Sequence, residues 1–534
     1  MTKKRTTPAS VSPENHKFDP PDLDSLIERP IESETPEKII DHIGSLIDAS
    51  GDRRSGAGTA RAFELLEHVR ARHLTAKQAV VTHYFAANAW HNRRGERPTD
   101  HWSWEQPEVR EQILELRKAR WHRGFDALEP VRRSQIRTNL GNQLSFIGRF
   151  IEALDEREPV VLVDGRLAMP LGNQAMTIST YARALYDPGH ARLMLLAAKR
   201  LFSRALGNGM TWELDSYEGA KEEFSRYHDW ITGNVDLTNA RRVMFKNYSL
   251  GKTPEEQTYR QWCLSKKLFL NPLNDLGPLT IAGRDALTLP PLRTPVTAKM
   301  PWTIGFFNQM KQEFVSARYM YYQGVTSTVS HFSDYRVLLL NTLDYPSYAL
   351  AVERQRTAFR VAYSILDKIG FFLNDYFSVG RKPRDVSFRK IWYEKDNETL
   401  LRRFVNNKNW PLRGLFWLSK DLFDKDMHTS TEPDARALDE MRNRLEHRYL
   451  QVHETWAAGV GIPRTRGNTE LPRYSVSRDH LEEKTLRLLK LSRAALIYLS
   501  LAVHQEERLH PRRRRTTGLI AQMPIDTWED DWKR

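Results

Sequence analysis

The chain has 534 residues, with 81 Lys and Arg against 67 Asp and Glu, so its formal net charge is +14 and its pI is about 9.6. Apolar residues make up 40% of the chain, which excludes general disorder and predicts large folded cores, in roughly two to four domains. The single cysteine, Cys263, excludes an intrachain disulfide and a cysteine-based zinc site, and it is typical of a reducing cytosol.

The N-terminal residues do not have the pattern of a secretory signal. Lys3, Lys4 and Arg5 are followed by Pro, Ser and Glu rather than by an apolar segment. The longest apolar stretch, residues 494–503, is much too short to cross a membrane. We therefore expect a folded, basic protein of the cytoplasm.

The positive charge is compatible with a nucleic-acid partner, because Lys and Arg neutralise phosphates. A net charge of +14 over this length is not a dense patch, however, so charge alone does not decide the question. The one local concentration, Arg512–Arg515, lies in a charged tail, residues 511–534, where a solvated and disordered tail is the simpler interpretation.

The first 210 residues divide into two parts. Residues 1–35 are rich in Pro, Thr, Ser and charge without periodicity, and we expect a disordered lead-in. Residues 36–210 have a helical pattern in successive two-helix units.

One of these units, Arg133–Leu154, is similar to a tetratricopeptide repeat. Small residues such as Gly141 and Gly148 let two helices approach, and large ones fill the gap. Further units are expected from Leu171 and over Ala60–Trp90. Ordinary helical hairpins are the alternative, and both interpretations predict a grooved surface that a partner could occupy.

Residues 211–300 form an aromatic-rich middle segment, which we expect to consist of short helices and irregular chain. Prolines such as Pro272 and Pro290 end helices here and indicate a boundary near residues 290–300. The aromatic side chains could stack on bases, but packing into a core is the commoner role of such residues.

Residues 301–344 are expected to form a connecting helical segment, followed by an antiparallel helical bundle over residues 345–510. Its first helix, within Tyr348–Phe377, has apolar residues at spacings of three and four, namely Phe359, Ala362, Leu366, Ile369, Leu373 and Tyr376. Further helices are predicted around Phe388–Trp392, around Leu415–Phe423, from about Ala435 to Trp456, and from Arg478 to about Arg508 with one apolar side.

The common catalytic signatures are absent from the sequence. Gly251-Lys252-Thr253 resembles the end of a phosphate-binding loop, but Lys246 stands where that loop needs its first glycine. A zinc-hydrolase helix motif, a nucleophile elbow and a dinucleotide fingerprint are also missing. An NTPase, a zinc hydrolase and an α/β-hydrolase are therefore disfavoured.

Three polar residues in Arg442-Asn443-Arg444-Leu445-Glu446-His447 carry the chemistry that we predict. If this segment is helical, Asn443 and His447 share one face, turned away from the apolar stripe, and Arg442 reaches the same point. Histidine moves protons near neutral pH, arginine binds a phosphate as charge builds on it, and asparagine orients either group.

Such a trio suits metal-free cleavage of an RNA phosphodiester by its own 2′-hydroxyl, which leaves a 2′,3′-cyclic phosphate and a 5′-hydroxyl. An arginine followed closely by a histidine is a weak signal, since Arg94 with His101 and Arg448 with His453 also have it. The Arg-Asn dipeptide at 442–443, however, occurs once in the chain.

Residues from about 345 to 510 resemble the HEPN superfamily of all-α, nucleic-acid-associated domains. The resemblance rests on Arg442, Asn443 and His447, on the flanking Leu445-Glu446-His447 with Tyr449, and on Tyr363–Lys368 in the first helix. Trp262-Cys263-Leu264 and Asn271–Asp275 are similar to a bacterial branch in which a tetratricopeptide-like region precedes the nuclease.

The resemblance implies a metal-independent endoribonuclease without cofactors, with catalytic residues Arg442, Asn443 and His447 in a composite site of a homodimer. It also implies a role in phage defence or a toxin-type response, with RNA as substrate and a protein or phage-derived trigger on the N-terminal region. Glu353 and Asp367 are candidates for the accessory acid of the superfamily. The alternatives are a non-catalytic adaptor and an RNA-binding protein without turnover.

Overall fold

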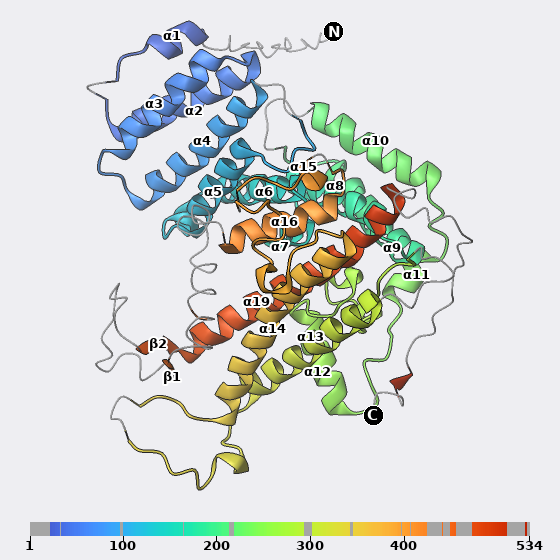
Figure 1. The fold of residues 1–534 in the computed structure, drawn as a ribbon. Coiled ribbons are helices and arrows are strands. Elements are labelled where there is room, and N and C mark those ends of the chain that lie inside the picture. The colour runs from blue at the N-terminus through green and yellow to red at the C-terminus, as the bar shows by residue number, and fades with distance from the viewer. Residues whose placement is uncertain are drawn as a thin grey trace, which may run out of the picture.

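The structure, a computed structural model, describes residues 22–31, 34–96, 100–163, 165–212, 218–292, 302–341, 345–396, 398–405, 407–423, 441, 449–454, 473–509 and 529–530. Within these ranges the regular secondary structure is helical apart from one pair of short strands, which confirms the expected all-α class. Figure 1 shows a long helix, α19 (Arg478–Leu509), that passes through the centre of the molecule. No helix in the described ranges is long and apolar enough to span a lipid bilayer.

The N-terminal part is a succession of helical hairpins. Its helices are α1 (Leu23–Glu28), α2 (Pro36–Arg53), α3 (Gly56–Arg70), α4 (Ala76–Gly95), α5 (Pro107–Trp121), α6 (Pro130–Phe146), α7 (Phe150–Val163), α8 (Ala168–Ala184) and α9 (Pro188–Ala205), with the short 3-10 helix η1 (Phe125–Ala127). Several begin with proline, whose missing N–H costs nothing in the first turn. Neighbouring helices pack as pairs, as expected, and the repeat interpretation of these pairs stays a prediction.

The disordered lead-in expected over residues 1–35 contains a helix, α1 (Leu23–Glu28). Leu23 and Leu26 of α1 are buried against α2 and α3, so apolar burial orders a segment whose composition lacks periodicity.

The middle segment contains α10 (Glu218–Asn234), α11 (Ala240–Phe245), α12 (Pro254–Ser265), η2 (Pro272–Leu276) and η3 (Thr280–Ala282). Its aromatic residues differ in burial. Phe224 and Phe269 are buried in the main core, as expected, whereas Trp230 and Phe245 are exposed. A Cβ atom on Gly172 would lie 1.9 Å from the Phe224 ring, so only glycine lets α10 pack this closely on α8.

The C-terminal part consists of α13 (Trp302–Thr326), η4 (Phe332–Asp334), α14 (Leu350–Tyr376), η5 (Pro383–Asp385), α15 (Arg402–Val405), α16 (Trp410–Phe423), β1 (Tyr449–His453), β2 (Arg473–Ser477) and α19. The predicted apolar seam of α14 is confirmed, since all six of its residues are buried. The helix predicted around Phe388–Trp392 is wrong. These residues form turns, because Trp392 donates its indole N–H to the Phe388 carbonyl and the backbone at Phe388 packs on Gly370.

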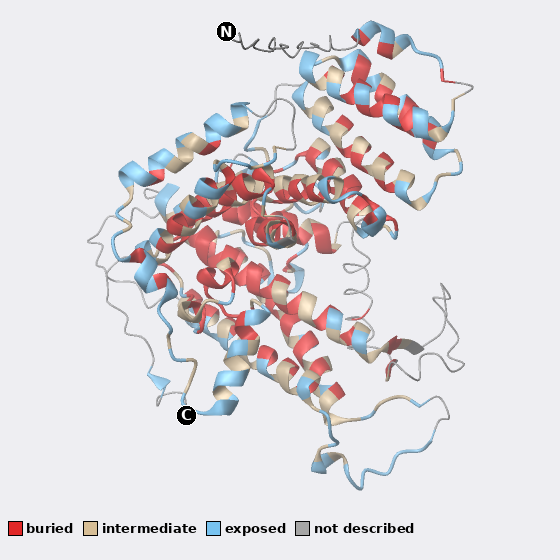
Figure 2. Ribbon diagram, turned by 180° about the vertical axis from the view of Figure 1, so that it is seen from behind, coloured by how far each residue is buried: buried red, intermediate tan, exposed pale blue. Residues whose placement is uncertain are grey.

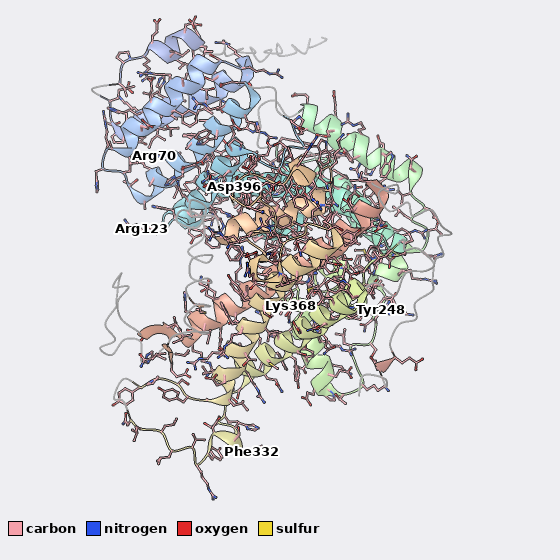
Figure 3. The ribbon with its side chains drawn as sticks, viewed as in Figure 1. Arg70, Arg123, Tyr248, Phe332, Lys368 and Asp396 are labelled. Carbon is pink, nitrogen blue, oxygen red and sulfur yellow. The ribbon has the colours of Figure 1, made fainter. Side chains whose placement is uncertain are left out.

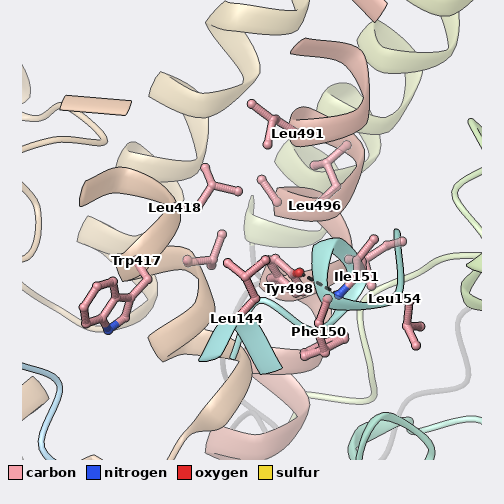
Figure 4. Close-up of a cluster of buried hydrophobic side chains, with 14 of the residues drawn as sticks. Leu144, Phe150, Ile151, Leu154, Trp417, Leu418, Leu491, Leu496 and Tyr498 are labelled. Carbon is pink, nitrogen blue, oxygen red and sulfur yellow. Dashed lines mark hydrogen bonds between the residues drawn. The ribbon is translucent and has the colours of Figure 1, made fainter. Parts of the chain in front are cut away.

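Helix α19 is buried on all sides, which goes beyond its predicted one-sided pattern. From Leu488 to Val503 nearly every residue is buried, as Figure 2 shows along the centre of the molecule. Its second face packs on the N-terminal part, where the Tyr498 hydroxyl accepts a hydrogen bond of 3.0 Å from the Ile151 N–H (Figure 4). The N-terminal helices from α4 onward, the middle segment and the C-terminal part therefore share one hydrophobic core.

A second junction joins α16 to the N-terminal part. Arg117 of α5 donates two hydrogen bonds of 2.6 Å to the Asp421 carboxylate, which also pairs with Arg149. At Gly148 the backbone is left-handed (φ 92°), and a Cβ atom there would lie 2.3 Å from the Trp410 carbonyl oxygen. Glycine is thus required where α16 contacts the turn between α6 and α7.

Candidate active site

The predicted catalytic residues Arg442, Asn443 and His447 lie outside the described residues. What the structure does describe is the chain on either side of them. Met441, directly before the trio, is helical and fully buried in the main core. Leu450, shortly after it, is 3% exposed and belongs to the same core. The described chain is therefore buried on either side of the motif, at Met441 and at Leu450.

The predicted helix from about Ala435 to Trp456 is wrong at its C-terminal end. Tyr449–His453 form strand β1, which pairs in parallel with β2 in the register Leu450 to Tyr474 and Val452 to Val476. The apolar residues here fit a period of two as well as a helical one, and pairing with a distant segment decides between them. The helical-wheel argument for the direction of His447 therefore does not extend past residue 448.

Strand β1 is attached to the start of α14 through its backbone. The Arg356 Nη2 atom donates to the Leu450 carbonyl over 2.8 Å, and the Ser347 N–H donates to the Val452 carbonyl over 2.7 Å. Arg356 also pairs with Glu353, one of the two candidates for the accessory acid. Glu353 is half-exposed and lies in the first turn of α14, whereas Asp367 lies farther along the same helix.

Arg478 connects the end of β1 to the start of α19. Its guanidinium pairs with Glu454 at 3.3 Å and with Glu482 at 3.0 Å. Burial opposes the charged form, but hydrogen bonds and the charges of these two carboxylates raise the pKa of Arg478 above its usual value. Gln355 of α14 also donates to Glu482, so β1, α14 and α19 meet in one polar junction.

The face of β1 opposite Leu450 and Val452 is polar and buried. Gln451 and His453 are 4% and 2% exposed, and Gln451 accepts a hydrogen bond from Ser475 of β2. Among the described residues, neither ring nitrogen of His453 has a hydrogen-bond partner, which is uncommon for a buried imidazole. In the sequence His453 stands out only as a member of one of several weak Arg–His pairs. Its burial could not be predicted, because spacing alone does not indicate which side chains are buried.

Neither a metal-binding cluster nor a reactive thiol is found in the part of the chain that the structure describes. There, no group of three or more His, Cys, Asp or Glu residues is arranged to hold a metal ion. Cys263 is buried in the middle segment, and burial raises the pKa of its thiol to about 11, so the thiol stays protonated at neutral pH.

The structure thus defines a helical protein with a short polar motif in its C-terminal part. In the chain this motif follows the buried Met441 and precedes strand β1. Residues 295–506 match the family described as LA2681-like HEPN, and this part of the chain is a HEPN domain. The matched range includes α13, α14, α16, both strands, most of α19 and the three motif residues. No curated protein and no solved structure matches the chain.

Proposed function

We propose that this protein is a cytoplasmic endoribonuclease that cleaves RNA without a metal ion, with Arg442, Asn443 and His447 as its catalytic residues. The observation that carries the proposal is the position of these residues within the HEPN domain, between buried Met441 and anchored β1. Buried or bonded chain on either side of the motif suits a reaction that depends on positioning.

In this mechanism His447 transfers the proton of the attacking 2′-hydroxyl or of the leaving 5′-oxygen. Arg442 stabilises the negative charge that develops on the phosphate, and Asn443 orients one of these groups. The 2′-oxygen forms a bond to phosphorus as the bond to the 5′-oxygen breaks, so the products carry a 2′,3′-cyclic phosphate and a 5′-hydroxyl.

We further propose that the protein is a homodimer joined through its C-terminal part, in which two trios form one composite site. Support comes from an apolar loop between α13 and α14, described over residues 327–341 and 345–349, whose large side chains are exposed. These are Val329, Phe332, Tyr335, Val337, Leu338, Leu339, Leu340, Tyr345 and Tyr348. Contiguous exposed apolar residues mark protein interfaces.

A second copy of the chain is the partner that this loop favours. Leu338 and Leu340 are 94% and 86% exposed, and a symmetric pairing of two such loops would cover both. Ser347 at the end of the loop is bonded to β1, and Figure 1 shows loop and strands at the same end of the molecule. Dimerisation here would bring together the two copies of β1, the strand that follows the motif in the chain.

We also propose that the N-terminal helices sense a protein or phage-derived trigger, in phage defence or a toxin-type stress response. The support is the order of parts: the N-terminal region has no catalytic signature, yet it shares its core with α19 of the HEPN domain. A partner bound to these helices would therefore act on the same packed body as the nuclease.

The test is incubation of the purified protein with RNA in excess chelator, followed by analysis of the product ends. Cleavage that leaves cyclic phosphates and is lost in His447→Ala and Arg442→Ala supports the proposal. Exposed residues of the same types, in His101→Ala and Arg384→Ala, are the matched controls and should retain cleavage. If RNA is not cut even with cell extract or phage components, the protein is an adaptor; if it is only bound, it is an RNA-binding protein.

A further inference from the structure

A group of cationic side chains lies where α3, α4 and α5 meet, around one buried carboxylate. Glu115 of α5 is 5% exposed and accepts from Arg70 of α3 at 2.6 Å, from His83 of α4 at 2.7 Å and from Lys118 at 2.7 Å. Burial opposes its ionisation, but these partners lower the pKa of Glu115 to about 2. The carboxylate is thus ionised at neutral pH and holds three side chains in place.

The positive charge around Glu115 exceeds what one carboxylate can balance. His122 and Arg123 follow at the end of α5, and we call Arg70, His83, Lys118, His122 and Arg123 the basic face. Among the described residues, Glu115 is the one carboxylate that forms ion pairs with them. Burial and the charges of His83 and Arg123 lower the pKa of His122, so at neutral pH its imidazole adds a hydrogen-bonding group while Arg70, Lys118 and Arg123 supply the positive charge.

The basic face is accessible and rigid. The side chains of Arg70 and Lys118 are 37% and 33% exposed, and Arg123 is exposed. The turn after α5 packs closely on α4, since a Cβ atom on Gly124 would lie 2.3 Å from the Ala76 carbonyl oxygen. Figure 3 shows Arg70 and Arg123 on the same edge of the molecule.

An exposed aromatic side chain, Trp121, comes directly before His122 and Arg123 of the basic face in the chain. Trp121, the last residue of α5, is 52% exposed, and the Arg120 guanidinium lies 4.9 Å from its ring centre. A large exposed indole beside arginines is the combination with which proteins bind single-stranded nucleic acid, because phosphates take the charges and bases stack on the ring.

The basic face also lies at the end of α5 that contacts α16. Arg117 of this helix binds Asp421, and α16 ends at Phe423, from which the chain continues toward Met441 and the motif. A strand of RNA bound along the end of α5 would therefore lie beside the element that precedes the HEPN motif in the chain.

We propose that the basic face is a binding site for the phosphate backbone of RNA, with Trp121 stacking on a base. The inference rests on the proposed function in naming RNA as the ligand. An acidic protein would satisfy the cations but has no planar base for Trp121, so the structure favours nucleic acid.

The test measures RNA binding separately from cleavage. The full-length His447→Ala variant is titrated against a fluorescent single-stranded RNA in chelator, at several salt concentrations, alone and combined with Arg123→Glu or Trp121→Ala. Arg226→Glu on α10, whose side chain is 74% exposed, is the control with the same change in charge. We expect Arg123→Glu to weaken binding about tenfold and to reduce the salt slope by about 0.7 for each phosphate that is no longer neutralised.

Trp121→Ala should also weaken binding, and Arg226→Glu should leave it within about twofold, since it lies away from the basic face. Equal effects of Arg123→Glu and Arg226→Glu would overturn the proposal. So would displacement of RNA by polyglutamate together with unchanged binding by Trp121→Ala, because the face would then suit acidic proteins. If no RNA is cut but Arg123→Glu weakens binding, only the proposed catalysis fails; if Arg123→Glu cuts RNA with an unchanged KM, only the basic face fails.

Discussion

Arg493 of α19 and Asp275 of η2 form an ion pair of 2.6 Å in which both side chains are 2% exposed. The same guanidinium donates to the carbonyl oxygens of Phe269 and Asn271, and the Tyr181 hydroxyl of α8 donates to the second Asp275 oxygen. One residue of the HEPN domain thus satisfies the backbone of the middle segment, and that segment joins α19 to the N-terminal helices.

Replacing Arg493 by Met should destabilise the protein strongly. The substitution leaves the Asp275 carboxylate buried without its counter-ion, which costs about 3–5 kcal/mol in comparable pairs. Thermal unfolding measures the loss. Arg508→Met, near the exposed end of the same helix, is the control and should change stability by no more than about 0.5 kcal/mol. Equal effects of the two substitutions would show that the buried pair contributes no stability.

The sequence predicts α14, α16 and α19 well, because their apolar periodicity is long enough to outweigh local ambiguity. It does not predict the role of Asn271–Asp275. Asn271 caps η2 through the Leu273 N–H, and the Asn274 amide donates to the Leu264 carbonyl. The second of these bonds joins residues of separate turns, so the role of Asn274 becomes visible only in three dimensions.

Strand β1 and the turn at Phe388–Trp392 escape prediction for the same reason. Both are short apolar segments whose pattern fits more than one structure, and distant partners decide between them: β2 for the strand, and Gly370 for the turn. The chemistry predicted for the site rests on residue types alone. The described surroundings of the motif, Met441, Arg356 and β1, could not be predicted, because Arg356 lies far from the motif in the sequence.

The ion pairs of Glu115 should make stability depend on acidic pH. Its pKa in the folded protein is about 2, below the ordinary value of 4.5, so its contribution is present above pH 4.5 and is lost as the pH falls toward 2. Glu115→Gln should therefore destabilise the protein at pH 6, by on the order of 3 kcal/mol.

The check is the difference in thermal stability between wild type and Glu115→Gln from pH 6 down to pH 2.5, which should shrink at the acidic end. Glu64→Gln, whose side chain is 66% exposed, provides the surface comparison and should show a small difference that is nearly constant with pH. A difference for Glu115→Gln that does not change with pH would contradict the lowered pKa.

His453 should tolerate an apolar replacement. Within the described part of the chain its two ring nitrogens are buried without partners, so His453→Leu removes unsatisfied polar atoms and should keep or raise the unfolding temperature. Gln451→Leu on the same face breaks the bond to Ser475 and should lower stability by about 1 kcal/mol. Unfolding temperatures compare the two. A marked loss of stability in His453→Leu would show that the imidazole has an essential polar contact.

The apolar loop should control the oligomeric state. Leu338→Asp combined with Leu340→Asp places two charges where the proposed dimer buries leucines, and we expect a dimer of the wild type to become a monomer in light scattering after gel filtration. RNA cleavage should fall in parallel, since the proposed composite site needs both protomers. Leu162→Asp is the control, because Leu162 is 76% exposed on α7 and its charge should leave the dimer intact. A double variant that remains a dimer would contradict dimerisation through the loop. A wild type that is monomeric and still cuts RNA would contradict the composite site.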